Sequence, residues 1–347
     1  FFQRVVLYGE IGFGESYMAG EWKTSDLVSL ISYLIANQES LALLSGSQVK
    51  TFLLNFLHVR DQVIHLFREN TLKGSKRNIQ AHYDLGNEFF QTFLDSTLTY
   101  SSAYFKNGQE SLEQAQVQKY ERICEKLEIR PEDHLLEIGS GWGGFACYAA
   151  KTYGCRVTTL TLSERQREWV LQRTKQEGLS RQVQVELKDY REIQGEFDHI
   201  VSIEMLEAVG HRYLPRFFKT CDRVLKKKGK LALQVILFPD SRYEEQRRQV
   251  NWIQKHIFPG SLLPSVTAIQ QALSNTDLWL SSFEEMGLSY AKTLSLWRKK
   301  FNTNLQSIQG RGFNEEFIRK WNYYFTLCEA AFRMRHINVG QFIYVRP

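Results

Sequence analysis

The segment that most constrains the fold is a short apolar run followed at once by glycines. Residues 135–138 read Leu-Leu-Glu-Ile, and residues 139–144 read Gly-Ser-Gly-Trp-Gly-Gly before a helical pattern begins. A strand that ends in such a turn and runs directly into a helix lets bare backbone approach a cofactor. The same turn serves nicotinamide dinucleotides, nucleotide phosphates and S-adenosylmethionine, so the turn alone does not choose among them.

Two neighbouring features separate these ligands. Glu137 precedes the first glycine, and a carboxylate there suits a cationic ligand and repels a pyrophosphate. The second predicted strand ends in Thr161-Leu162-Ser163, without the acidic residue that holds a ribose in dinucleotide-binding proteins. Both features favour a sulfonium cofactor.

Helix and strand patterns alternate along most of the chain, which predicts an α/β fold with a mostly parallel sheet covered on both faces. The predicted strands are residues 135–138, 156–161, 183–187, 199–203, 231–236 and 341–345. The predicted helices are residues 111–127, 144–153, 164–177 and 214–225, followed by an aromatic helical tail at 281–332. We expect this tail and the last strand to complete the sheet and wall off a pocket.

The first 75 residues have a different character and predict a small, mainly helical leading domain. Residues 7–16 are rich in glycine and are expected to form turns, and amphipathic helices are predicted at 25–36, 41–57 and 59–70. The connector at residues 71–78 concentrates basic side chains, namely Lys73, Lys76 and Arg77. At about 150 residues per domain, a chain of 347 residues is expected to hold two domains, here 1–75 and 76–347.

Composition narrows the function classes. With 43% apolar and 24% charged residues the chain is not a disordered one, and its apolar runs fall short of the roughly 18 residues of a membrane span. Five cysteines without a C-x-x-C pair predict free thiols in the cytoplasm and no metal site. The net charge of +6 is mild and its basic residues are scattered, which argues against nucleic-acid binding.

Several longer motifs resemble the cyclopropane fatty acid synthase family, and they cover nearly the whole chain. Even the leading Gly12-x-Gly14-Glu15-Ser16-Tyr17-Met18 stretch is similar to the accessory domain of the bacterial lipid-acting members. The matching stretches are His82 to Phe90, Leu98 to Phe105, Glu137 to Gly144, Thr161 to Gln166, Glu204 to His211, Ile257 to Ser265 and Tyr290 to Arg298.

The resemblance implies a Rossmann-like class I methyltransferase that uses S-adenosylmethionine to add a methylene bridge across the cis double bond of an unsaturated phospholipid acyl chain. An isolated alkene is a poor nucleophile, so the methyl sulfonium must be held in line with it in a dry cavity. The carbocation that forms must be shielded until one methyl proton is removed, and in the family a bound bicarbonate ion takes that proton. The resemblance also implies peripheral association with the inner face of the membrane and a homodimer.

Carried over position by position, Glu207 and Tyr290 match two members of the family's bicarbonate site. The other two positions depart from the family pattern: Ser102 stands where a cysteine is usual, and Gln234 where a histidine is usual. Both replacements still offer hydrogen-bond donors. The resemblance further assigns the cofactor shell to Tyr100, Ser101, Glu137, Gly139, Ser140, Gly141, Thr161, Leu162, Gln166, Asp189 and Tyr190.

Other interpretations remain open at this point. Methylation of the acyl chain without ring closure, a small-amine N-methyltransferase and a catalytically silent lipid-binding protein all fit parts of the pattern. The side chains also have structural interpretations: Tyr100 as a core aromatic, Glu207 as a complement to a helix dipole, and Tyr290 as an ordinary strand residue.

Overall fold

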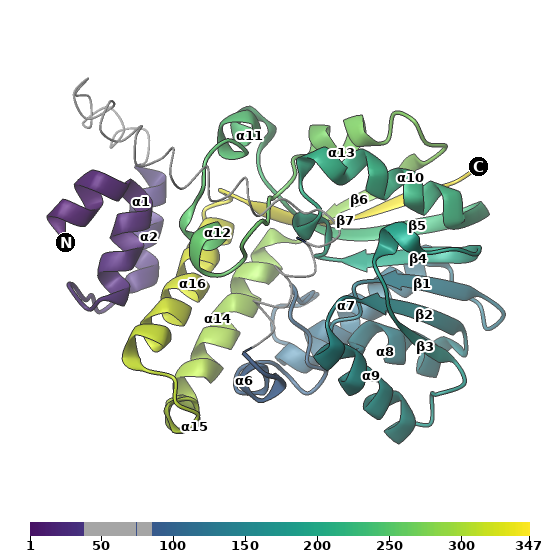
Figure 1. Cartoon of the computed structure of the whole chain (residues 1–347), viewed down its shortest axis with the longest axis horizontal. Coiled ribbons are helices and arrows are strands. Elements are labelled where there is room, and N and C mark those ends of the chain that lie inside the picture. The colour runs from purple at the N-terminus through teal and green to yellow at the C-terminus, as the bar shows by residue number, and fades with distance from the viewer. Residues whose placement is uncertain (38–73, 75–84) are drawn as a thin grey trace.

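The computed structural model describes residues 1–37, 74 and 85–347, and that part of the chain contains a mixed β-sheet, seen mainly in the right half of the view (Figure 1). Its strands run in the order β3-β2-β1-β4-β5-β7-β6. β1 to β5 pair in parallel, while β7 lies antiparallel between β5 and β6. The predicted Rossmann-like α/β fold is therefore confirmed. The strands are β1 His134–Ile138, β2 Arg156–Thr161, β3 Val183–Leu187, β4 Phe197–Ile203, β5 Leu225–Leu237, β6 Trp279–Glu285 and β7 Asn338–Val345.

The strand order reverses at β1, which lies between β2 and β4. The chain leaves the carboxyl end of β1 toward β2 and the carboxyl end of β4 toward β5, in opposite directions, so a crevice opens between these two ends. Open α/β sheets bind their ligands at such a point. Gly139 follows β1 directly and Glu204 follows β4 directly. The topology thus brings the glycine turn and Glu204 to the same edge of the sheet.

Side chains on successive strand residues enter two separate cores, as the period of two in a strand requires. Leu135 packs with residues of α7 and α8 on one face, and Leu136 packs with residues of α10 and α13 on the other. Burial on both faces explains why the strands read as nearly continuous apolar runs.

The helices begin where the sequence supplies caps: the Ser111 side chain accepts a hydrogen bond from Gln114 N, and the Ser163 side chain accepts one from Gln166 N. The helices are α1 Phe2–Met18, α2 Leu27–Ala36, α6 Asn87–Gln91, α7 Leu112–Leu127, α8 Gly144–Tyr153, α9 Glu164–Gln176, α10 Leu214–Val224, α11 Asp240–Gln246, α12 Trp252–His256, α13 Val266–Ala272, α14 Gly287–Thr303, α15 Leu305–Gly310 and α16 Glu315–Arg333.

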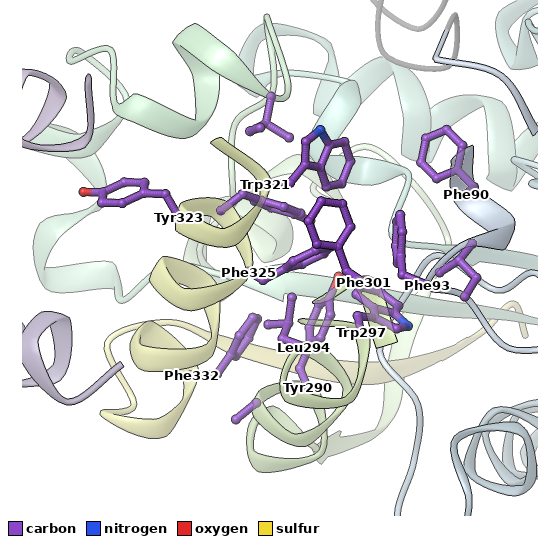
Figure 2. Close-up of a cluster of buried hydrophobic side chains, with 14 of the residues drawn as sticks. Phe90, Phe93, Tyr290, Leu294, Trp297, Phe301, Trp321, Tyr323, Phe325 and Phe332 are labelled. Carbon is purple, nitrogen blue, oxygen red and sulfur yellow. The ribbon is translucent and has the colours of Figure 1, made fainter. Parts of the chain in front are cut away.

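A third core, rich in aromatic side chains, lies between α14 and α16 (Figure 2). Trp297 and Phe301 of α14 and Trp321 and Phe325 of α16 are almost completely buried there, together with Phe93. The helices α1 and α2 pack against α16 and contribute Ile11, Met18 and Ile31 to the same core. The aromatic tail therefore does form a wall beside the carboxyl edge of the sheet.

Some sequence expectations need correction, and others concern residues that the structure does not describe. Residues 7–16 do not form a turn-rich stretch but belong to α1, with one non-helical residue at Gly9 (φ 54°). The tail does not begin as helix, because Trp279–Glu285 is strand β6, and Tyr290 lies in α14 and not in a strand. The helices predicted at 41–57 and 59–70, most of the basic connector and the proposed boundary at residue 75 lie outside the described residues.

Within the described part of the chain, every helix is too short or too polar to span a bilayer.

Candidate active site

The glycine turn after β1 is held against β2 and leaves open space in front of it. The backbone nitrogens of Gly139 and Ser140 donate to Leu160 O at 3.1 and 2.8 Å. Gly139 and Gly141 have φ values of 100° and 49°, a region that favours glycine. A Cβ atom built on Gly141 would meet no atom within 4 Å. The turn thus presents bare backbone to the space beyond it, as a bound cofactor requires.

That space is a cavity of about 350 Å³, within the range of small-molecule sites. Its lining combines the glycine turn with apolar side chains that include Ile253, Phe258 and Leu294. Of the residues predicted to contact cofactor or substrate, the cavity is lined by Tyr100, Ser101, Glu137, Gly139, Ser140, Gly141, Thr161, Leu162, Gln166, Tyr190, Glu207 and Tyr290.

Three of the predicted site residues lie outside this lining. The carboxylate of Asp189 is held by the side chain of Arg191, at 2.7 and 2.6 Å, and by the Arg191 backbone nitrogen at 2.9 Å. Ser102 and Gln234 are almost completely buried, and both donate hydrogen bonds to Glu204. The structure therefore places Tyr190, but not Asp189, at the cavity.

Two buried ionisable side chains, Glu137 and Lys119, lie close to the glycine turn and to Ser101. Glu137 accepts a hydrogen bond from the Thr159 hydroxyl at 2.5 Å, and burial raises the pKa of Glu137 to about 8. The ammonium of Lys119, completely buried, donates to Ser101 Oγ at 2.7 Å. Burial lowers the pKa of Lys119 to about 7, while Glu204 and other nearby carboxylates oppose that shift.

Glu204 lies at the centre of a ring of donors from three parts of the chain. Its Oε1 accepts from Ser102 N and from Gln234 Nε2, both at 2.8 Å, and its Oε2 accepts from the Tyr290 hydroxyl at 2.9 Å. The structure thus brings Ser102, Gln234 and Tyr290 together as predicted, around a side chain that the sequence analysis gave no role.

Glu207 follows in the 3₁₀ helix Leu206–Ala208 and also lines the cavity. Its Oε1 accepts from Ile236 N at 2.5 Å, whereas its buried Oε2 has no hydrogen-bond partner among the described residues. Burial, and next the charge of Glu204, raise the pKa of Glu207 to about 8. At neutral pH, Glu207 is therefore a protonated carboxylic acid that can exchange a proton with the cavity.

Sequence reasoning missed Lys119 and Glu204. Lys119 lies in an amphipathic helix whose pattern gives no sign that a lysine faces inward. Glu204 carried one usable signal: it is a charged residue directly after a buried parallel strand, at the edge where ligands bind.

Comparison with known proteins decides the family. Residues 70–342 match the mycolic acid cyclopropane synthetase family. The chain belongs to this family. It is an S-adenosylmethionine-dependent methyltransferase, in agreement with the glycine turn and the acidic residue beside it.

Three members show how far the likeness extends. The chain is 36% identical to the tuberculostearic acid methyltransferase of Mycobacterium tuberculosis, over 99% of this chain and 81% of that protein. It is 35% identical to the cyclopropane-fatty-acyl-phospholipid synthase of Escherichia coli, over 100% and 86% of the two chains. A crystal structure of a mycolic acid cyclopropane synthase complexed with SAH and CTAB superposes with a TM-score of 0.71, at 32% identity, over 78% of this chain and 97% of that one.

Proposed function

We propose that this protein transfers the methyl group of S-adenosylmethionine to the cis double bond of an unsaturated phospholipid acyl chain and closes a cyclopropane ring. The observation that carries the proposal is a cavity whose lining combines the glycine turn, apolar side chains and the two carboxyl groups of Glu204 and Glu207. The Escherichia coli relative, named for this reaction on phospholipids, supports the substrate class.

The residues at the glycine turn suit a cationic methyl donor. Bare backbone at Gly139 and Gly141 admits the cofactor closely, and Glu137 offers a carboxylate to its positive charge. Thr161 donates to Gln166 Oε1 at 2.8 Å, which fixes the amide beside the expected adenosine position. When bound there, S-adenosylmethionine supplies an electrophilic methyl group. We therefore assign the cofactor shell to the cavity-lining residues predicted from the sequence, without Asp189.

The apolar half of the cavity suits an acyl chain and the carbocation formed on it. Side chains from α14, α16 and residues 253–263 make this half, and they exclude water from the reacting carbons. We also propose that residues 1–75 form an accessory domain and residues 76–347 the catalytic one. We further propose that Lys73, Lys76 and Arg77 attach the protein to the membrane surface. The family resemblance also implies that the protein forms a homodimer.

Bicarbonate, which the resemblance implies as the base, does not fit the donor ring as the structure has it. Ser102 N, Gln234 Nε2 and the Tyr290 hydroxyl already donate to Glu204. A second anion placed against that buried carboxylate would meet strong repulsion. The proposed reaction therefore includes no bicarbonate step.

A second candidate is methylation of the acyl chain without ring closure. The 36% identity to a tuberculostearic acid methyltransferase favours it, as do Ser102 and Gln234 at the two positions that depart from the family pattern.

The test is mass spectrometry of vesicle lipids after incubation with the protein and S-adenosylmethionine, followed by double-bond localisation. A gain of one CH₂ unit with loss of the alkene, and cyclopropane proton resonances, is the expected result. The same gain with the alkene retained would establish the second candidate. Unchanged lipids, with cofactor binding intact, would overturn both and favour an amine methyltransferase or a silent lipid-binding protein.

A further inference from the structure

The side chain of Glu204 occupies the ring of donors in which an external base was expected. Each of its oxygens is held: Oε1 by Ser102 N and Gln234 Nε2, and Oε2 by the Tyr290 hydroxyl. A carboxylate has about four lone-pair sites, so three donors leave one. Glu204 also lines the cavity, which brings it within reach of a group bound there.

Residues outside the ring orient the Gln234 side chain so that it presents a donor to Glu204. The ammonium of Lys126, which can only donate, contacts Gln341 Oε1 at 2.9 Å. The Gln341 amide nitrogen must then face Gln234 Oε1, at 3.1 Å, and this turns the Gln234 amide nitrogen toward Glu204. A chain of three residues thus fixes a donor, and not an acceptor, against Glu204.

The backbone at Glu204 is itself in an unfavourable conformation. Its φ of 49° is uncommon for a residue with a side chain, and residues held in this way cluster at functional sites. The backbone nitrogen of Glu204 donates to Gln234 O at 2.7 Å, which anchors the residue to the end of β5. The side-chain bonds and this anchor together keep the carboxylate in place.

Lys119 supplies the positive charge that an ionised carboxylate needs in this buried position. Burial raises the pKa of Glu204, and the nearby Lys119 ammonium opposes that shift most strongly. Lys119 approaches from α7, on the side of the Ser101 hydroxyl to which it donates.

We propose that Glu204 is the base of the reaction, a built-in carboxylate that takes the place of bicarbonate. The inference rests on the proposed function and adds to it the group that removes the proton. It makes catalysis independent of dissolved carbon dioxide.

The step balances without a further reactant. The alkene π pair forms a bond to the methyl carbon, the C–S electron pair stays with sulfur, and a carbocation remains on the acyl chain. Glu204 then takes a proton from the added methyl group, and the C–H electron pair closes the third side of the ring. S-Adenosylhomocysteine, the cyclopropane lipid and a neutral Glu204 result, and Glu204 returns its proton to water before the next turnover.

The test compares the wild type with Glu204→Gly and Glu204→Gln in buffer stripped of carbon dioxide, with and without added bicarbonate or formate. Glycine accepts the φ of 49° and leaves the donor ring open to a small anion, whereas glutamine keeps the ring filled. The matched control is Glu128→Gly, since Glu128 is also a non-glycine residue at positive φ (57°) but is exposed at the end of α7. Binding of isotopically labelled bicarbonate, followed by its NMR line width, gives a readout separate from turnover.

We expect the wild type and Glu128→Gly to turn over equally with and without bicarbonate, and to bind none. Both Glu204 variants should lose turnover by about 10²-fold or more, and added bicarbonate or formate should restore Glu204→Gly but not Glu204→Gln. A wild type that binds bicarbonate, or needs it for turnover, would overturn the inference while leaving the proposed function intact. Full turnover of either Glu204 variant in stripped buffer would overturn it as well. A wild type that modifies no lipid would instead count against the proposed function, and the binding measurement would still decide whether the donor ring is filled.

Discussion

The hydroxyl of Tyr290 donates to Glu204 Oε2 over 2.9 Å, and this bond joins α14 to the carboxyl end of β4. The Tyr290 ring packs against Phe332 of α16, with ring centroids 4.6 Å apart (Figure 2). Burial, followed by the charge of Glu204, raises the pKa of the phenol well above its usual value, so it remains a donor at every working pH. The aromatic helices thus help to hold the carboxylate at the edge of the sheet.

The Tyr290→Phe variant tests this bond. Phenylalanine keeps the ring contacts but removes one of three donors to Glu204, and a hydrogen bond to a charged group contributes roughly 1.5–3 kcal/mol. We expect kcat to fall about 10- to 100-fold with little change in cofactor affinity, measured by lipid turnover and by calorimetry. Tyr344→Phe is the control, because the Tyr344 hydroxyl accepts a bond from Gln270 at 2.9 Å away from the cavity lining. Equal losses in both variants would show that the effect comes from removing any buried hydroxyl and not from the bond to Glu204.

The Glu207→Gln variant tests the second carboxyl group. Glutamine keeps the acceptor for Ile236 N and the neutral charge that Glu207 has below pH 8, but it cannot relay to water the proton that Glu204 gains in each turnover. We expect turnover to fall about 10²-fold while cofactor affinity stays nearly the same. Glu244→Gln, on the exposed surface of α11, should retain full turnover. Normal turnover of Glu207→Gln would remove Glu207 from the mechanism.

The sequence predicts the sheet well because its strands are buried on both faces and its helices carry caps. The strands at 156–161 and 183–187 have the bounds that the sequence predicts. Strand β6 escaped prediction because its residues are almost all exposed at the edge of the sheet, so no burial pattern marks it. The helix over residues 7–16 was missed because glycines normally end helices, whereas Gly12 and Gly14 here are buried in close contacts, and Trp252 atoms lie within 2.5 Å of a Cβ built on Gly14.

The site was predictable only where a motif marks it. The glycine turn and Glu137 follow from local sequence, and the family resemblance points to Glu207 and Tyr290. The resemblance also groups Ser102, Gln234 and Tyr290, which are far apart in sequence, but it does not predict that the Glu204 side chain accepts hydrogen bonds from all three. A lysine buried in α7 is equally invisible to periodicity, since only the fold places the Lys119 ammonium beside carboxylates.

The Gly141→Val variant tests the cofactor turn. A Cβ atom there meets no protein atom within 4 Å, so we expect a valine to extend into cofactor space and to strain its own backbone by roughly 1–2 kcal/mol at a φ of 49°. We expect a folded protein that no longer binds S-adenosylmethionine, measured by calorimetry. Gly178→Val is a matched control, since Gly178 also has positive φ (73°) and open space around it but lies outside the cavity lining. Unchanged affinity in folded Gly141→Val would refute the assigned turn.

The ionisation of Glu137 should make cofactor binding depend on pH. Burial raises the pKa of Glu137 to about 8, so the empty protein holds this group protonated at neutral pH, whereas a cationic ligand favours its ionised form. Binding below pH 8 must therefore release the proton, and affinity should rise with pH by up to about tenfold per unit until it levels off above pH 8. The Glu137→Gln variant has no proton to release, so its profile should lack this rise. Any ionisation of the ligand itself is common to both proteins, so calorimetry across pH 6 to 9 isolates the contribution of Glu137 as the difference between the two profiles. Identical profiles would place the positive charge of the ligand away from Glu137.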